Sequence, residues 1–126
     1  MISRTRDADK AGAFQLTAEV FGATDSEMYT RDIARREWLY RSPRVRAKRV
    51  DEAEAWLRKQ LGAHMPNPGE VYIWGRVTLG CWTPTSWDDE EYGFVEDAEY
   101  DTYDGPGAVD IYATRRADGE IVVTRD

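Results

Sequence analysis

The sequence predicts an α+β fold, in which an antiparallel sheet of about four to five strands carries two helices packed on one face and ends in a C-terminal β-hairpin. Three observations predict this class. Apolar residues alternate with polar ones over residues 14–20 and again over residues 71–81, which is the period of a half-buried strand. Two helical patterns lie between these strands. Near the end of the chain, two runs of β-branched residues flank Asp118 and Gly119, a dipeptide that tight hairpin turns favour.

The first helix is predicted over residues 25–40. Thr24 and Glu27 have the spacing of a capping box, in which each side chain bonds the other residue's backbone N–H. Apolar residues such as Ile33 and Tyr40 would then lie on one side of the helix.

The second helix is predicted to start at Asp51, because Asp51 and Glu54 repeat the capping-box spacing. Gly62 closes it, and Pro66 lies just beyond. Its apolar stripe has the three- and four-residue spacing of a helix face and consists of Ala53, Trp56, Leu57, Gln60 and Leu61.

The connecting residues 43–50 fit either an extension of the second helix or a short strand. Alternation of Val45 and Ala47 with basic residues favours the strand. A strand would place Arg44, Arg46 and Lys48 on one face.

The chain of 126 residues is long enough for one domain with one core. Residues 1–12 are polar and without periodicity, so we expect an N-terminal tail, followed by a single α+β domain over residues 13–126. The N-terminus has no apolar segment typical of a signal peptide, and Cys81 is the only cysteine. These features favour a cytoplasmic protein without a disulfide.

Charge is segregated along the chain, whose formal net charge is −7. Residues 31–59 hold ten basic side chains and five acidic ones, whereas residues 77–114 hold ten acidic side chains and no lysine or arginine. This balance argues against direct binding to nucleic acid or to an anionic membrane, because both need a basic face.

The acidic side chains concentrate in residues 86–105, where nine carboxylates alternate with bulky and aromatic residues. In a strand, Asp97, Glu99 and Asp101 would share one face about 6.6 Å apart, and Phe94 and Tyr100 would share the other. Like charges so aligned repel one another, which suggests a role other than folding.

Three explanations compete for this stretch. The first is a calcium-binding loop that starts at Asp97. Such a loop needs glycine at its sixth position and glutamate at its twelfth, where this chain has Thr102 and Ala108. The second is a solvated surface that limits aggregation, or one that pairs with the protein's own basic segment.

The third explanation, which we favour, is a docking surface for a partner protein with a basic, nucleic-acid-binding surface. Tyrosine and tryptophan supply contact area with a polar tip and are enriched at interfaces. Spaced carboxylates can also stand in for phosphates, as in a nucleic-acid mimic. The predicted contact residues are Asp88, Asp89, Glu90, Glu91, Glu96, Asp97, Glu99, Tyr100, Asp101, Tyr103 and Asp104. In size and charge the chain is similar to small acidic inhibitors of phages and mobile elements, such as anti-restriction and anti-CRISPR proteins; the likeness is one of composition, without a shared motif.

Two alternatives use the basic residues. The cluster between Arg41 and Arg49 could bind a phosphorylated or nucleotide ligand, as an enzyme or a binding domain, because guanidinium groups suit phosphate. Acidic and basic faces could instead pair copies of the chain in a homo-oligomer. No catalytic motif, cofactor motif or metal-ligand cluster is present, and His64 and Cys81 are the residues of a conceivable but disfavoured nucleophile pair.

Overall fold

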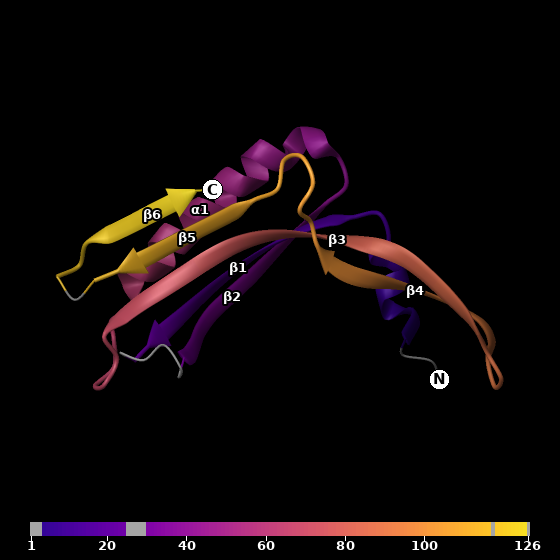
Figure 1. The fold of residues 1–126 in the computed structure, drawn as a ribbon, viewed down its shortest axis with the longest axis horizontal. Coiled ribbons are helices and arrows are strands. Elements are labelled where there is room, and N and C mark those ends of the chain that lie inside the picture. Colours follow the sequence, from indigo (N-terminus) through magenta and orange to yellow (C-terminus); the bar gives the residue numbers. More distant parts are fainter. Residues whose placement is uncertain (1–3, 25–29, 117, 126) are drawn as a thin grey trace.

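A computed structural model describes residues 4–24, 30–116 and 118–125 of the chain. Its elements, in chain order, are η1 (Arg4–Lys10), β1 (Phe14–Ala23), β2 (Thr30–Tyr40), η2 (Pro43–Val45), α1 (Arg46–Ala63), β3 (Tyr72–Asp89), β4 (Gly93–Thr102), β5 (Asp110–Arg115) and β6 (Ile121–Arg125), where η marks a 3-10 helix (Figure 1). No helix in these ranges is long and apolar enough to cross a membrane.

The six strands form one curled antiparallel sheet in the order β2-β1-β3-β5-β6, and β4 pairs with β3 alone. The 18-residue strand β3 connects the whole sheet. Residues 72–81 of β3 pair with β1, residues 73–78 pair with β5 on the other edge, and residues 80–89 pair with β4. The predicted α+β class is therefore confirmed, whereas the predicted two helices on one face are reduced to the single α-helix α1.

The predicted first helix is wrong for residues 30–40, which form β2; residues 25–29 lie outside the described ranges. β2 pairs with β1 from Phe14 opposite Tyr40 to Ala23 opposite Thr30. Its burial shows the period of a strand, because Trp38 and Tyr40 are buried and the residue between them is exposed. Tertiary pairing with β1 thus overrides the local helical spacing.

The strand predicted over residues 43–50 is also wrong. Ser42 precedes the 3-10 turn η2, and its hydroxyl accepts a hydrogen bond from the Arg44 backbone N–H at 3.3 Å. Pro43 suits the first position of such a turn, because it has no N–H to leave unpaired. The turn leads directly into α1, which begins at Arg46, before the predicted start, and ends one residue beyond Gly62.

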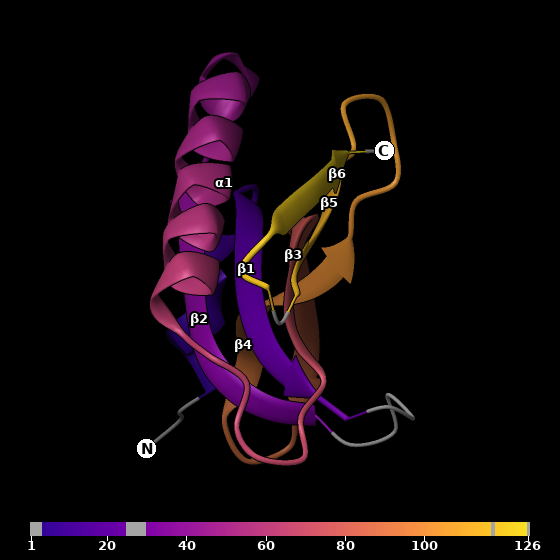
Figure 2. The ribbon, with the colours of Figure 1, turned by 90° about the vertical axis from the view of Figure 1, so that its left-hand side faces the viewer.

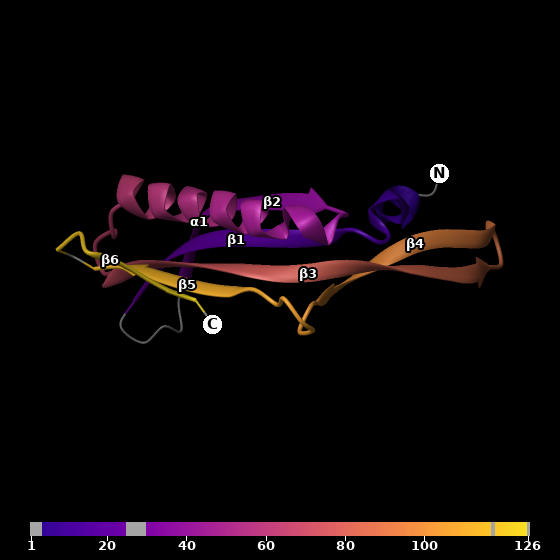
Figure 3. The same ribbon diagram turned by 90° about the horizontal axis from the view of Figure 1, so that it is seen from above.

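Helix α1 covers one face of the sheet, and the described helices η1 and α1 both lie on this side (Figures 2 and 3). Its buried residues are Val50, Ala53, Leu57 and Leu61. They confirm the predicted apolar stripe in part, since Trp56 is only partly buried at the rim. The sheet contributes the fully buried side chains of Leu16, Val20, Ile73, Val77, Leu79 and Ile111 to the same core.

The predicted C-terminal hairpin is confirmed as β5 and β6. Its connection is longer than a two-residue turn, because the Arg116 N–H donates to the Glu120 carbonyl at 3.0 Å. Gly119 has a φ of 90°, which a glycine adopts without strain, and the Asp118 carboxylate accepts a hydrogen bond from the Glu120 N–H.

The loop that enters β3 is fixed by Glu70. Its carboxylate accepts two hydrogen bonds from the Arg31 guanidinium, each 2.9 Å long, and one from the Asn67 N–H at 2.7 Å. Gly22 makes room for this group, because a Cβ there would lie 2.3 Å from a Glu70 oxygen. The bonds from Arg31 and then from Asn67 hold the pKa of Glu70 below its ordinary value of 4.5.

Replacing Glu70 with glutamine should destabilise the fold at neutral pH and have less effect in acid. A carboxyl group whose pKa is lower in the folded state stabilises the protein fully above its unfolded pKa, and this contribution is lost as the pH falls through the folded pKa. Urea unfolding of wild type and Glu70→Gln at about pH 7 and about pH 3 tests this. Glu120→Gln, at an exposed glutamate without an ion pair among the described side chains, is the matched control. Equal destabilisation by Glu70→Gln at both pH values would contradict the prediction.

Candidate functional site

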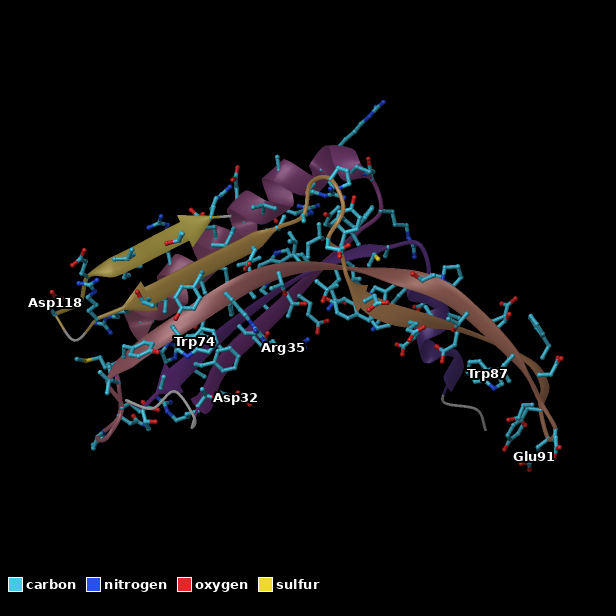
Figure 4. The ribbon with its side chains drawn as sticks, viewed as in Figure 1. Asp32, Arg35, Trp74, Trp87, Glu91 and Asp118 are labelled. Carbon is cyan, nitrogen blue, oxygen red and sulfur yellow. The ribbon has the colours of Figure 1, made fainter. Side chains whose placement is uncertain are left out.

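The acidic stretch forms a two-stranded arm that extends away from the rest of the sheet (Figures 1 and 3). The arm consists of residues 82–89 of β3 and all of β4, joined by residues 90–92. Strand β1 pairs with β3 only as far as Cys81, so the arm projects beyond it. Trp87 and Glu91 lie at the far end (Figure 4).

The tip of the arm is a turn built by its own residues. The Asp89 carboxylate accepts hydrogen bonds from the backbone N–H groups of Glu91 at 2.8 Å and Tyr92 at 3.1 Å. Gly93, with a φ of 77°, then starts β4 in a conformation that other residues rarely adopt. Asp89 therefore has a structural role in addition to its charge.

The N-terminal segment supports the base of the arm. Residues 4–10 of the segment predicted to be a tail form η1, which packs against β4. Gly12 and Ala13 continue the sheet by exchanging backbone hydrogen bonds of 2.8 and 2.9 Å with Trp82. Arg41 donates to the backbone carbonyls of Asp9 and Ala11 and so holds this segment to the end of β2.

The carboxylates lie on both faces of the arm, at its tip and in the loop after it, and not on a single face. Asp97, Glu99 and Asp101 share one face, as predicted, because they pair with the alternate residues Thr85, Thr83 and Cys81. Glu96 and Asp88 belong to the opposite face, Glu90 and Glu91 lie in the tip, and Asp104 lies in the loop after β4.

Eight of the eleven predicted contact residues are exposed, and Asp89, Asp97 and Tyr103 are partly buried. Asp97 lines a pocket of about 260 Å³ between the N-terminal segment and the arm, together with Ala8 and Ala11. Its carboxylate accepts a hydrogen bond from the Ala98 N–H at 2.8 Å. Asp97 is therefore less available to a partner than Glu99 or Asp101.

Most acidic side chains of the arm, and Asp104 in the loop after it, are exposed to solvent. Among the described residues, no ion pair joins a lysine or arginine to Asp88, Glu90, Glu91, Glu96, Asp97, Glu99, Asp101 or Asp104. Internal neutralisation by the basic segment, one of the alternatives for this stretch, is thus not seen in the described part of the monomer.

Exposed aromatic rings lie among these acids. Trp87, Tyr92, Phe94 and Tyr100 all have more than a third of their surface open to solvent, and Phe94 is 64 % exposed. The alternation predicted Phe94 on the face opposite Asp97, Glu99 and Asp101, and Phe94 is absent from the predicted contact residues. Its place directly after the Gly93 turn, at the end of a ribbon with few neighbours, explains its exposure.

The predicted cluster from Arg41 to Arg49 is dispersed, because these residues form a turn and a helix in place of a strand. Arg41 holds the N-terminal segment, and Arg49 pairs with Glu52 at 2.8 Å. Arg46 lies against three aromatic rings and donates to the Tyr40 hydroxyl at 2.8 Å. Arg44 and Lys48 remain exposed.

Cys81 and His64 do not meet. His64 follows α1, and its carbonyl accepts a hydrogen bond from Arg115, which pairs with Ile73. Cys81 lies eight residues along β3 from Ile73, or roughly 26 Å at the rise of a strand. Among the described residues, no three histidine, cysteine or acidic side chains are placed to hold a metal ion.

Comparison of the chain with protein-family models, with curated proteins and with solved structures gives no match.

Proposed function

We propose that this protein acts by binding, and that its acidic arm docks on a basic, nucleic-acid-binding surface of a partner protein. The observation that carries the proposal is the arm itself, a projecting ribbon whose carboxylates, Asp89 set aside, have no ion pair among the described residues and alternate with exposed rings. A surface that served solubility alone would have no use for Phe94 and Trp87 in solvent.

Mimicry of nucleic acid is the form of docking that we favour. Carboxylates on one face of β4 recur about every 6.6 Å along the strand, and others lie on the opposite face and at the tip. A groove that attracts phosphates would attract such a rod by the same field, with fast association and a steep dependence on salt. The exposed rings add the apolar contact that a bound nucleic acid obtains by stacking. The partner's normal function would be inhibited because its groove is occupied.

Reversing two charges, in the variant Glu99→Lys/Asp101→Lys, should weaken partner binding at least about tenfold, because like charges would then face each other. These two residues are preferable to Asp97, since both are exposed and neither makes a hydrogen bond or ion pair among the described side chains. The control with an equal change of net charge is Asp51→Lys/Glu120→Lys, on α1 and the β5–β6 turn; it also removes the exposed ion pair of Asp51 with Arg125 at 3.4 Å.

Affinity capture from a lysate of the source organism, at about 50 mM and about 500 mM salt, supplies the measurement. We expect a nucleic-acid-binding protein that is released by high salt, displaced by added DNA or RNA, retained by the control variant and lost by the arm variant. Equal capture of a partner by wild type and by Glu99→Lys/Asp101→Lys would overturn the proposal, and so would the absence of any captured protein at the lower salt concentration. A mass that rises with protein concentration would point to the homo-oligomer alternative.

A further inference from the structure

The sheet face opposite α1, here called the open face, carries a row of three aromatic rings. Phe21 on β1 lies directly opposite Trp74 on β3, and Tyr112 on β5 lies diagonally across from Trp74. Phe21 and Trp74 have ring centroids 4.6 Å apart with 31° between planes, and Trp74 and Tyr112 have centroids 5.6 Å apart with 28° between planes. Rings this close, with small angles between their planes, overlap face to face, so the three rings form an offset stack across three strands, with Trp74 in the middle. Tyr112 is 42 % exposed, and the described helices all lie on the other side of the sheet.

Strand alternation gives the open face its charges. The carboxylates are Glu19, Asp32, Glu37 and Asp110, and the guanidinium groups are Arg35 and Arg76. Arg76 pairs with Glu19 at 3.3 Å, and Arg35 pairs with Glu37. The side chains left without an ion pair among the described residues are thus Asp32 and Asp110, both negative.

Asp32 lies next to the aromatic row. It is directly opposite Phe21 in the pairing of β1 with β2, beside the irregularity at which Ile33 has no opposite residue. Phe21, Asp32, Glu19 and Arg35 line a shallow pocket of about 270 Å³ at this point. Figure 4 shows Trp74, Asp32 and Arg35 on this part of the sheet. The stack of rings therefore ends, at Phe21, beside a carboxylate that has no ion pair among the described side chains.

This combination suits a guanidinium group. Guanidinium is planar, stacks on aromatic faces and forms paired hydrogen bonds with a carboxylate, whereas the rounder ammonium of lysine does not stack. The molecule itself already uses this chemistry, because the Arg76 guanidinium lies 5.9 Å from the Phe21 centroid and bonds to Glu19. Nucleic acid is disfavoured as an occupant, since its phosphates would face a net negative surface.

We infer that the open face is a second docking surface, on which the end rings of the stack, Phe21 and Tyr112, contact arginine side chains of a cationic protein partner, and Asp32, beside Phe21, accepts hydrogen bonds from one of them. The inference extends the proposed function, on which it rests for the basic character of the partner. The arm and the open face are continuous along β3, so one basic partner can contact both.

Nuclear magnetic resonance titration of the isotope-labelled full chain with an oligo-arginine peptide tests the inference residue by residue. We expect shifts of the Trp74 indole N–H and of the amides of Phe21, Asp32 and Tyr112. An oligo-lysine peptide of equal length should shift these signals less. Asp32→Asn and Trp74→Leu should each weaken the oligo-arginine effect at the open face by about five- to tenfold. Because Asp32 is exposed, Asp32→Asn stays informative if Trp74→Leu fails to fold.

The residues whose NMR signals shift distinguish binding at the open face from binding at the arm. Shifts confined to β4 and the tip would overturn the inference and leave the proposed function of the arm intact. Shifts at Trp74 that persist in Glu99→Lys/Asp101→Lys support the inference independently of the arm. Equal shifts with oligo-lysine would overturn stacking of guanidinium, and shifts caused by single-stranded DNA but not by oligo-arginine would overturn the choice of a protein partner.

Discussion

Gly75→Val is expected to lower the free energy of unfolding by about 3 kcal/mol or more, because α1 packs directly on the backbone of β3 at this residue. A Cβ at Gly75 would lie 2.4 Å from Leu57 Cδ1 and 2.8 Å from the Glu19 carbonyl oxygen. Leu57 is fully buried and has no room to retreat, and the Glu19 carbonyl belongs to the backbone of β1. Both neighbours must therefore shift to accept the side chain, at the cost of core packing.

Urea unfolding followed by circular dichroism measures the effect. Gly62→Ala is the matched control, since a Cβ at Gly62 meets nothing within 4 Å and alanine favours a helix. The control should be as stable as wild type or more stable by up to about 1 kcal/mol. An unchanged midpoint in Gly75→Val would show that the helix does not pack on β3 as described.

The strands with strict alternation were predictable from sequence, because their apolar side chains lie on the core face, although Gln15 and Thr17 on the other face of β1 are buried too. In β1 the even-numbered residues Leu16, Ala18 and Val20 are buried, and in β3 the odd-numbered residues Ile73 and Val77 face the same core. β2 was not predictable in the same way. It is an edge strand with three arginines and two acidic residues. Charged side chains protect such edges from pairing with other chains, but they also obscure the period of the strand.

The arm could be predicted only in part. The concentration of carboxylates is visible in the sequence, but the continuation of β3 through Pro84 is not, since proline is avoided in central strands. Pro84 is tolerated because it lies beyond Cys81, where β1 no longer pairs and one edge of β3 is open. Which acids share a face, and the exposure of Phe94, follow from the register of β3 and β4, which depends on tertiary pairing.

The basic segment shows the same dependence on tertiary structure. A row of arginines looks like a binding site in the sequence, yet two of them, Arg41 and Arg46, stabilise the junction between the arm and the rest of the sheet. Ser42 before Pro43 is the pattern of a helical start, but the alternation of basic and apolar residues favoured a strand. Charge density alone therefore did not separate contact residues from residues that stabilise the fold.

Arg46 joins four parts of the molecule and is the second position where a large effect is expected. Its guanidinium carbon lies 4.7 Å from the Phe14 ring centroid, 5.3 Å from that of Tyr103 and 6.0 Å from that of Tyr40. These rings belong to β1, to the loop after β4 and to β2, and Arg46 itself starts α1. We call Arg46 and these three rings the Arg46 box. The Tyr103 N–H donates to the Leu79 carbonyl at 2.9 Å, so the Arg46 box holds the base of the arm.

Arg46→Ala should lower the free energy of unfolding by about 2 to 3 kcal/mol, from the loss of the cation–π contacts and of the bond to the Tyr40 hydroxyl. Arg46→Lys should recover less than half of this loss, since an ammonium cannot stack between the rings while bonding to the hydroxyl. Urea unfolding measures both variants, with Arg44→Ala as the control at an exposed neighbour. Because the box lies at the base of the arm, hydrogen exchange of the β4 amides should also accelerate in Arg46→Ala, and not in the control. Full recovery by Arg46→Lys would show that the positive charge alone, rather than the planar guanidinium, stabilises the junction.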